Sequence, residues 1–203
     1  MRALTRWQLG GLVAACLAVI AVSLVAVGVW YPRSTAMPPP FRAEWRERSL
    51  AALAAANDDY KRWVSLPSAA LALSMDGDPA QATAIARETL ALAPKYERDW
   101  NHGNALHKAN LALGHLALRA GDREGARAFL KAAGDTPGSP QLDSFGPNMS
   151  LASAMLEAGE REAVLDYIER TTRFWKLSWG TATFWQVAIR LGFKPGFGPH
   201  ILF

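Results

Sequence analysis

Residues 113–133 read LGHLALRAGDREGARAFLKAA, and this stretch decides the fold class. Ala and Leu recur at helical spacing on both sides of the pair Gly121-Asp122. Glycine commonly ends a helix, and aspartate is a favoured cap for the helix that follows. Two small residues, Gly114 before the turn and Ala126 after it, let paired helices approach closely. The stretch therefore predicts two short antiparallel helices joined by a tight turn.

The same arrangement occurs twice more in the chain. Gly77-Asp78 lies 44 residues before Gly121, and Gly159-Glu160 lies 38 residues after it. Small residues precede each turn glycine by seven positions, and small or short ones follow it by five: Ala70, Gly114 and Ala152 before the turns, and Ala82, Ala126 and Val164 after them. With so few β-branched residues and no alternating apolar pattern, the chain is predicted to be all-α and internally repeated.

These turns and small residues resemble the tetratricopeptide-repeat family, most clearly over Leu113–Ala133. The family unit is about 34 residues long, so loops must be inserted between units here. The resemblance implies a solenoid of about three antiparallel helix pairs over residues 49–176, followed by a C-terminal capping helix. Residues 100–114 and 136–149, with Phe174-Trp175-Lys176, also resemble a group of bacterial repeat proteins that offers no activity to carry over.

The N-terminal part of the chain is strongly apolar. No charged residue occurs from Trp7 to Pro32, and about 20 apolar residues suffice to cross a bilayer core. Arg2 and Arg6 precede the segment, whereas only Arg33 follows it closely. Residues 1–32 are therefore predicted to be a single-pass transmembrane anchor with its N-terminus in the cytoplasm.

Two alternatives to a retained anchor fit the sequence less well. A cleaved secretory signal has an apolar region of about 7–15 residues, which is shorter than this one. Val13-Ala14-Ala15-Cys16 resembles a lipoprotein processing site, but the chain stays apolar well beyond Cys16. Cys16 is therefore interpreted as a small apolar thiol inside a spanning helix.

A proline-rich linker, residues 33–48, is predicted after the anchor. The run Pro38-Pro39-Pro40 favours an extended, semi-rigid conformation that holds the next domain close to the membrane. Beyond it, the pattern predicts one helix over residues 41–64 and a second that begins at Pro67.

The loop Asp135–Pro147 contains three prolines. It has no lysine and no preceding strand, so it does not fit a phosphate-binding loop. We expect Leu142, Phe145 and Met149 to pack between two repeats, and Asn148 to cap the next helix.

Three histidines invite a metal hypothesis, but their spacing is against it. His102, His107 and His115 are five and eight residues apart, whereas ligands on one helical face need spacings of three or four. They are interpreted as helix-surface or groove histidines, with Lys108 and His115 as candidate groove residues. No metal and no cofactor is expected.

The C-terminal segment, residues 177–203, is rich in aromatic residues. A helix near residues 181–191 places Trp185 on its apolar face, where it caps the repeats. Trp175 and Trp179 come in addition to Trp185 where charge is scarce, and no helical pattern around Trp179 or residues 201–203 supplies an internal partner. These form the predicted partner interface: Trp175, Trp179, Ile201, Leu202 and Phe203.

Composition and motifs narrow the function classes. The chain is 50% hydrophobic and 20% charged with a formal net charge of +4, which excludes a disordered chain and a multi-span membrane protein. Its charges are interspersed, so we expect no nucleic-acid binding. One cysteine excludes a disulfide framework and a thiolate zinc site.

No nucleophile–base pair, carboxylate pair or ligand cluster recurs at usable spacing, so no enzyme is expected. The sequence favours a membrane-anchored interaction or assembly subunit that docks on other protein subunits of a bacterial inner-membrane complex. Its residues 7–32 lie in the bilayer and its soluble domain in the periplasm. The alternatives are a periplasmic adaptor that binds peptides or proteins and, less favoured, an envelope enzyme with an unrecognised site.

Overall fold

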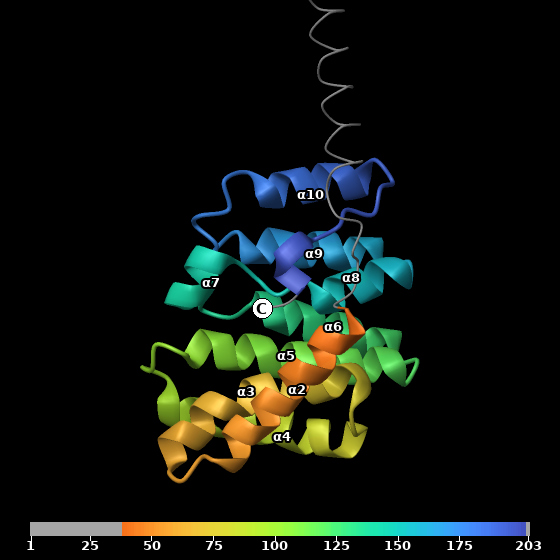
Figure 1. The fold of residues 1–203 in the computed structure, drawn as a ribbon. Coiled ribbons are helices and arrows are strands. Elements are labelled where there is room, and N and C mark those ends of the chain that lie inside the picture. Colours follow the sequence, from red (N-terminus) through yellow and green to blue (C-terminus); the bar gives the residue numbers. More distant parts are fainter. Residues whose placement is uncertain (1–37, 202–203) are drawn as a thin grey trace, which may run out of the picture. The chain divides into compact units, whose positions relative to one another are not determined.

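A computed structural model of the chain describes residues 38–201. This part contains helices and no strand, which confirms the all-α prediction (Figure 1). The predicted anchor and two of the predicted interface residues, Leu202 and Phe203, lie outside the described residues. Within residues 38–201, no helix has the length and apolarity needed to cross a membrane.

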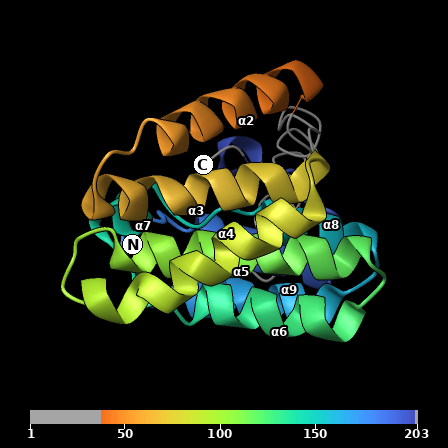
Figure 2. The same ribbon diagram turned by 90° about the horizontal axis from the view of Figure 1, so that it is seen from below.

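The helices follow one another with short connections. Their bounds are α2 Pro39–Ala54, α3 Asp59–Asp76, α4 Pro79–Leu92, η1 Ala93–Tyr96, α5 His102–Arg119, α6 Arg123–Gly134, α7 Pro140–Phe145, α8 Ser150–Glu157, α9 Arg161–Thr171, α10 Thr181–Arg190 and η2 Gly198–Ile201. Helix α3 packs on α4 and α5, α5 on α6, α6 on α9, and α9 on α10. Helix α2 lies on the outer side of α3, away from α6 (Figure 2).

The predicted turns separate α3 from α4, α5 from α6, and α8 from α9. Asp78 caps α4 by accepting hydrogen bonds from the main-chain N–H groups of Ala80 and Gln81. Asp122 caps α6 in the same way through the N–H of Gly125. Gly121 has a φ of 78°, a left-handed conformation that glycine adopts without steric cost.

The first predicted helix, residues 41–64, is wrong in its bounds. The chain leaves the helical conformation after α2, and Asp58 begins α3 by accepting a hydrogen bond from the N–H of Lys61 (2.7 Å). Residues 39–48 of the predicted linker are likewise part of α2. Pro39 and Pro40 fit its first turn because the amides there need no intrahelical acceptor.

Pro67 lies inside α3 and does not begin a helix. A proline in a helix interior costs about 3 kcal/mol, partly through the missing hydrogen bond. The same helix buries Trp63, Leu66 and Leu71 completely. Each such side chain contributes about 1.5–3 kcal/mol, so packing outweighs the local penalty.

The core has two separate parts. The main cluster runs through α3, α4, α5, α6, α8, α9 and α10. A smaller cluster of Trp63, Ala93 and Ala105 forms one corner, where the rings of Trp63 and Tyr96 stack with 4.8 Å between centroids. In the main cluster, α5 lies close to Leu151 of α8 at Gly114, where a Cβ atom would be 2.3 Å from Cδ2 of Leu151.

The loop after α6 packs tightly on α5. A Cβ atom on Gly103 would lie 1.8 Å from the carbonyl oxygen of Gly138, so the two backbones touch. Leu142 and Met149 are buried as predicted, but Phe145 is 67% exposed. Phe145 ends the short helix α7, which turns its ring away from the core. The predicted cap Asn148 is displaced by one residue, because Met149 is the N-cap of α8. Asn148 accepts a hydrogen bond from the N–H of Ser150, the first residue of that helix (2.9 Å).

Candidate functional site

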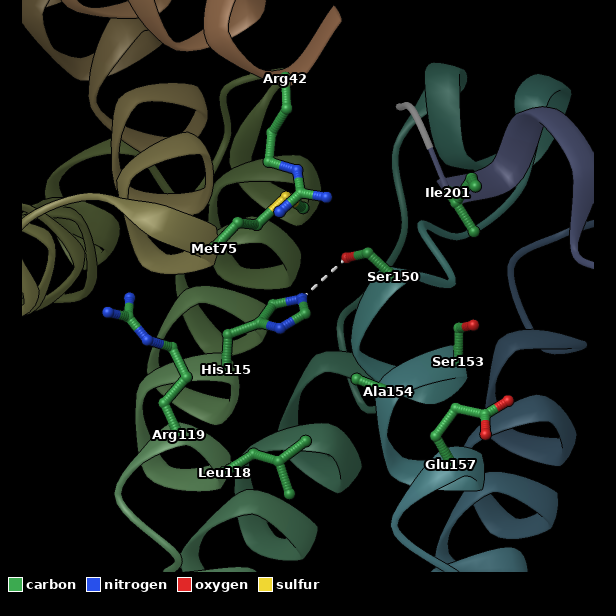
Figure 3. Close-up of a pocket in the computed structure, with 10 residues that line it drawn as sticks. All are labelled: Arg42, Met75, His115, Leu118, Arg119, Ser150, Ser153, Ala154, Glu157 and Ile201. Atoms are coloured by element: carbon green, nitrogen blue, oxygen red, sulfur yellow. Dashed lines mark hydrogen bonds between the residues drawn. The ribbon is translucent and has the colours of Figure 1, made fainter. Parts of the chain in front are cut away.

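A cavity of about 410 Å³ lies between α2 and α5 on one side and α8 and η2 on the other (Figure 3). Its lining combines two guanidinium groups, hydrogen-bonding side chains and an apolar wall: Arg42, Met75, His115, Leu118, Arg119, Ser150, Ser153, Ala154, Glu157 and Ile201. This volume is within the range of about 300–1,000 Å³ that is usual for ligand pockets.

The arginines enter the cavity from different helices. Arg42 belongs to the first turns of α2 and lies 4.0 Å from Asp76, which also pairs with Arg46. Arg119 is in the last turn of α5 and donates a hydrogen bond to the carbonyl oxygen of Ser74 (2.9 Å). Within residues 38–201, Arg119 has no carboxylate at ion-pair distance.

The one carboxylate of the lining is already paired. Glu157 accepts a hydrogen bond from Nζ of Lys194 at 2.6 Å. The guanidinium of Arg119 is therefore the charge in this cavity that is not offset by an acid of the described residues, and the cavity favours an anionic or hydrogen-bond-accepting group.

His115 faces Ser150 across the cavity, with 2.9 Å between Nε2 and Oγ. Burial, together with the positive charges of Arg119 and Arg42, lowers the pKa of His115 to about 4. A histidine that acts as a general base must become an imidazolium, which the same environment disfavours. The pair therefore suits hydrogen bonding of a ligand better than activation of the serine.

Sequence reasoning missed this serine–histidine contact. The two residues are 35 positions apart and lie on α5 and α8, so no local spacing connects them. The other groove candidate, Lys108, does not line this cavity. Its Nζ donates a hydrogen bond to Oγ of Ser68 (3.1 Å), and burial lowers its pKa.

The remaining histidines of α5 are separated from one another. His107 is buried and hydrogen-bonded to two backbone groups, whereas His102 lies at the first residue of the helix. Among the described residues, no three side chains of His, Cys, Asp or Glu gather in a way that could hold a metal ion.

Two of the predicted interface residues are buried inside the domain. Trp175 is 5% exposed and packs on the rings of Trp185 and His200, with centroids 5.5 and 4.9 Å away. Ile201 is 2% exposed. The expectation that Ile201 lacks an internal partner is wrong, because η2 folds back onto the core and α8. Trp175, also predicted at the interface, is instead buried against α10 and η2. Trp185 is fully buried, as predicted for the capping helix.

Trp179 differs from these aromatic residues. Its side chain is 89% exposed, and its φ of 48° places a bulky residue in the left-handed region. That conformation costs about 1–2 kcal/mol for a residue with a Cβ atom. No packing of the tryptophan ring offsets this cost within the described residues.

Trp179 is one of five exposed apolar residues on α10 and in the segments that flank it. We call these residues together the α10 surface: Leu177, Trp179, Val187, Leu191 and Phe193. Val187 and Leu191 are four residues apart, on the side of α10 opposite the buried Trp185 and Ile189.

Comparison with known proteins gives no family assignment. No protein-family model, no curated protein and no solved structure matches the chain.

Proposed function

We propose that this chain is a non-catalytic, membrane-anchored interaction subunit that docks on and stabilises a multi-subunit complex of the bacterial inner membrane. In this proposal residues 7–32 span the membrane with the N-terminus in the cytoplasm, and the helical domain lies in the periplasm. The tetratricopeptide-like interpretation is part of the proposal. It is supported by three helix pairs, α3–α4, α5–α6 and α8–α9, each with a Gly-Asp or Gly-Glu turn.

The cavity between α2, α5 and α8 is the observation that carries the proposal. It joins the guanidinium of Arg119, the His115–Ser150 pair and an apolar wall that includes Met75 and Leu118. Arginine next to apolar groups is typical of the residues that dominate protein–protein binding. A short segment of a partner subunit fits such a site better than a reacting substrate does, because His115 is held in its neutral form.

Purification of the tagged full-length chain from its native membranes tests this function. Arg119→Glu reverses the charge at the cavity, and we expect it to remove the partner subunits. Arg161→Glu is the matched control, since Arg161 is exposed on α9 and does not line the cavity. Partner subunits retained equally by both variants contradict the proposal.

The topology has a separate test. Reporter proteins fused after Gly134 should be active when they require the periplasm and inactive when they require the cytoplasm. The reverse result places the domain in the cytoplasm and overturns the proposed orientation.

A periplasmic adaptor that captures soluble peptides is the second candidate, and the same cavity supports it. The purification distinguishes the two. Membrane subunits that co-purify in fixed proportion support the assembly subunit, whereas a mixture of soluble peptides that Arg119→Glu removes supports the adaptor.

A further inference from the structure

We propose that the α10 surface rests on the headgroup region of an anionic phospholipid bilayer. This inference rests on the membrane anchor of the proposed function and does not involve the cavity.

The α10 surface has the composition of a membrane-interface surface. Trp179 is 89% exposed, and Leu191 and Phe193 are 64% and 65% exposed. Among the described helices, the inner side of α10 packs on α9, and its outer side has no packed neighbour (Figure 1). Tryptophan and phenylalanine next to basic residues are typical of segments that lie in the headgroup region.

The positive charge of the residues around this surface favours an anionic partner. The sequence contains no Asp or Glu from Arg170 to Phe203. Lys176 and Arg190 are exposed, and neither has a carboxylate at ion-pair distance within residues 38–201. Arg173 and Lys194 are partly offset by Asp135 and Glu157. Two acids from other elements contact the same segment: Asp143 accepts a hydrogen bond from the main-chain N–H of Lys176, and Glu169 accepts one from the side chain of Gln186. The charged residues of the segment itself are all basic, and a basic and apolar surface complements an anionic lipid headgroup layer.

The chain outside the structure keeps a bilayer close to the domain. The predicted span ends at Pro32 and α2 begins at Pro39, so six residues connect them. Six extended residues reach at most about 20 Å. The N-terminal end of α2 is the end that points toward α10 in the helix stack (Figure 1). The proposal places the bilayer on the side of the domain that carries the α10 surface.

A spin label on α10 tests the proposal in the full-length chain. Thr183 is exposed on α10 and is not part of the α10 surface, so Thr183→Cys in a Cys16→Ser background leaves the apolar residues intact. Ala84→Cys, exposed on α4, is the matched control site. The labelled chain is reconstituted into vesicles of phosphatidylcholine alone or of equal parts phosphatidylcholine and phosphatidylglycerol. Collision of the nitroxide with oxygen and with a water-soluble nickel chelate is measured.

We expect the label at Thr183 to be shielded from the nickel chelate in the anionic vesicles and less shielded in phosphatidylcholine, while the label at Ala84 stays accessible in both. Arg190→Gln and Lys176→Gln should each lower the docking equilibrium about fivefold. Arg87→Gln on α4 should leave it unchanged. Equal nickel accessibility at Thr183 and Ala84 in anionic vesicles overturns the inference.

Failure of this inference and failure of the proposed function give different results. A chain that alkaline carbonate washes from the vesicles has no membrane anchor, which overturns both. A chain that stays in the vesicles with an accessible label at Thr183 overturns the bilayer contact alone. Shielding that occurs in native membranes but not in lipid vesicles shows that a protein covers the α10 surface, and it also overturns the inference.

Discussion

The side chain of His107 accepts a hydrogen bond from the main-chain N–H of Asn148, with 3.1 Å between the two nitrogen atoms. Because Nε2 is the acceptor, Nδ1 carries the proton and donates to the carbonyl oxygen of Ala133 at 2.9 Å. The hydroxyl of Tyr167 donates to the carbonyl oxygen of Asn148 at 2.7 Å. One buried imidazole thus joins both ends of the loop between α6 and α8.

Stability should fall as the pH falls from about 6.5 toward 4. Burial lowers the pKa of His107 to about 4, as it does for His115. The unfolded chain, with a histidine pKa of about 6.5, binds more protons in this window, so protonation favours unfolding. At pH 5 the loss is about 2 kcal/mol per histidine. Urea unfolding of the full chain at pH 7 and pH 5 measures it.

The variant His107→Gln separates the two histidines. It should be less stable at pH 7, because it loses hydrogen bonds to Ala133 and Asn148, and its stability should change less between pH 7 and pH 5. An unchanged pH dependence would show that folding does not lower the pKa of His107.

The contact between Gly103 and Gly138 predicts a large effect of one methyl group. Alanine in a helix normally stabilises it by about 1 kcal/mol relative to glycine. In Gly103→Ala the new Cβ atom would overlap the carbonyl oxygen of Gly138. Since a backbone atom cannot move aside as a flexible side chain can, we expect a net destabilisation of about 3 kcal/mol. Thermal unfolding followed by circular dichroism measures it.

Gly121→Ala is the control for that variant. Its Cβ atom would meet nothing within 4 Å, and only the left-handed φ of 78° opposes it. The expected loss is about 1 kcal/mol. Equal losses for the two variants would contradict the close backbone contact.

Gly114 and Leu151 should behave as a coupled pair. Gly114→Leu overpacks the contact between α5 and α8 at a cost of about 1–3 kcal/mol, and Leu151→Ala leaves a cavity at a cost of about 2–5 kcal/mol. The larger side chain can fill that cavity, so the double variant should be more stable than the sum predicts by about 1 kcal/mol or more. Additive losses would show that the two residues do not share space.

The contribution of each C-terminal tryptophan to the free energy of unfolding should depend on how deeply its ring is buried. Trp185→Ala should cost about 3–5 kcal/mol, because the ring is fully buried against Trp175 and Phe197. Trp179→Ala should change the free energy of unfolding by no more than about 0.5 kcal/mol, since its ring is exposed. Chemical unfolding in detergent compares them. A large loss in Trp179→Ala would reveal packing of this ring.

The features that the sequence predicted well depend on neighbouring residues. Asp78 and Asp122 cap helices through amides two or three positions away, so the turns were visible in the sequence. A local signal gave a wrong prediction at Pro67, which was expected to begin a helix. It lies inside α3, because burial of Leu66 and Leu71 outweighs the missing hydrogen bond.

The candidate site depends on distant residues instead. His115 meets Ser150, and Arg119 meets Ser74, through pairs 35 and 45 positions apart. Trp175 and Ile201 are buried because the segment after α10 folds back, and no periodic pattern marks that return. A site whose residues come from several helices could not be predicted from the residue spacing within any one helix.

The small core of Trp63, Ala93 and Ala105 predicts that its corner of the domain unfolds locally before the main core does. We expect the stacked contact between Trp63 and Tyr96 to break while the main core remains folded. Backbone amides near η1 should therefore exchange with solvent at a free energy below that of global unfolding. A protease should therefore cut first at this corner. The loop between α6 and α8, although it lies at the surface, is held at both ends by His107 and should resist longer.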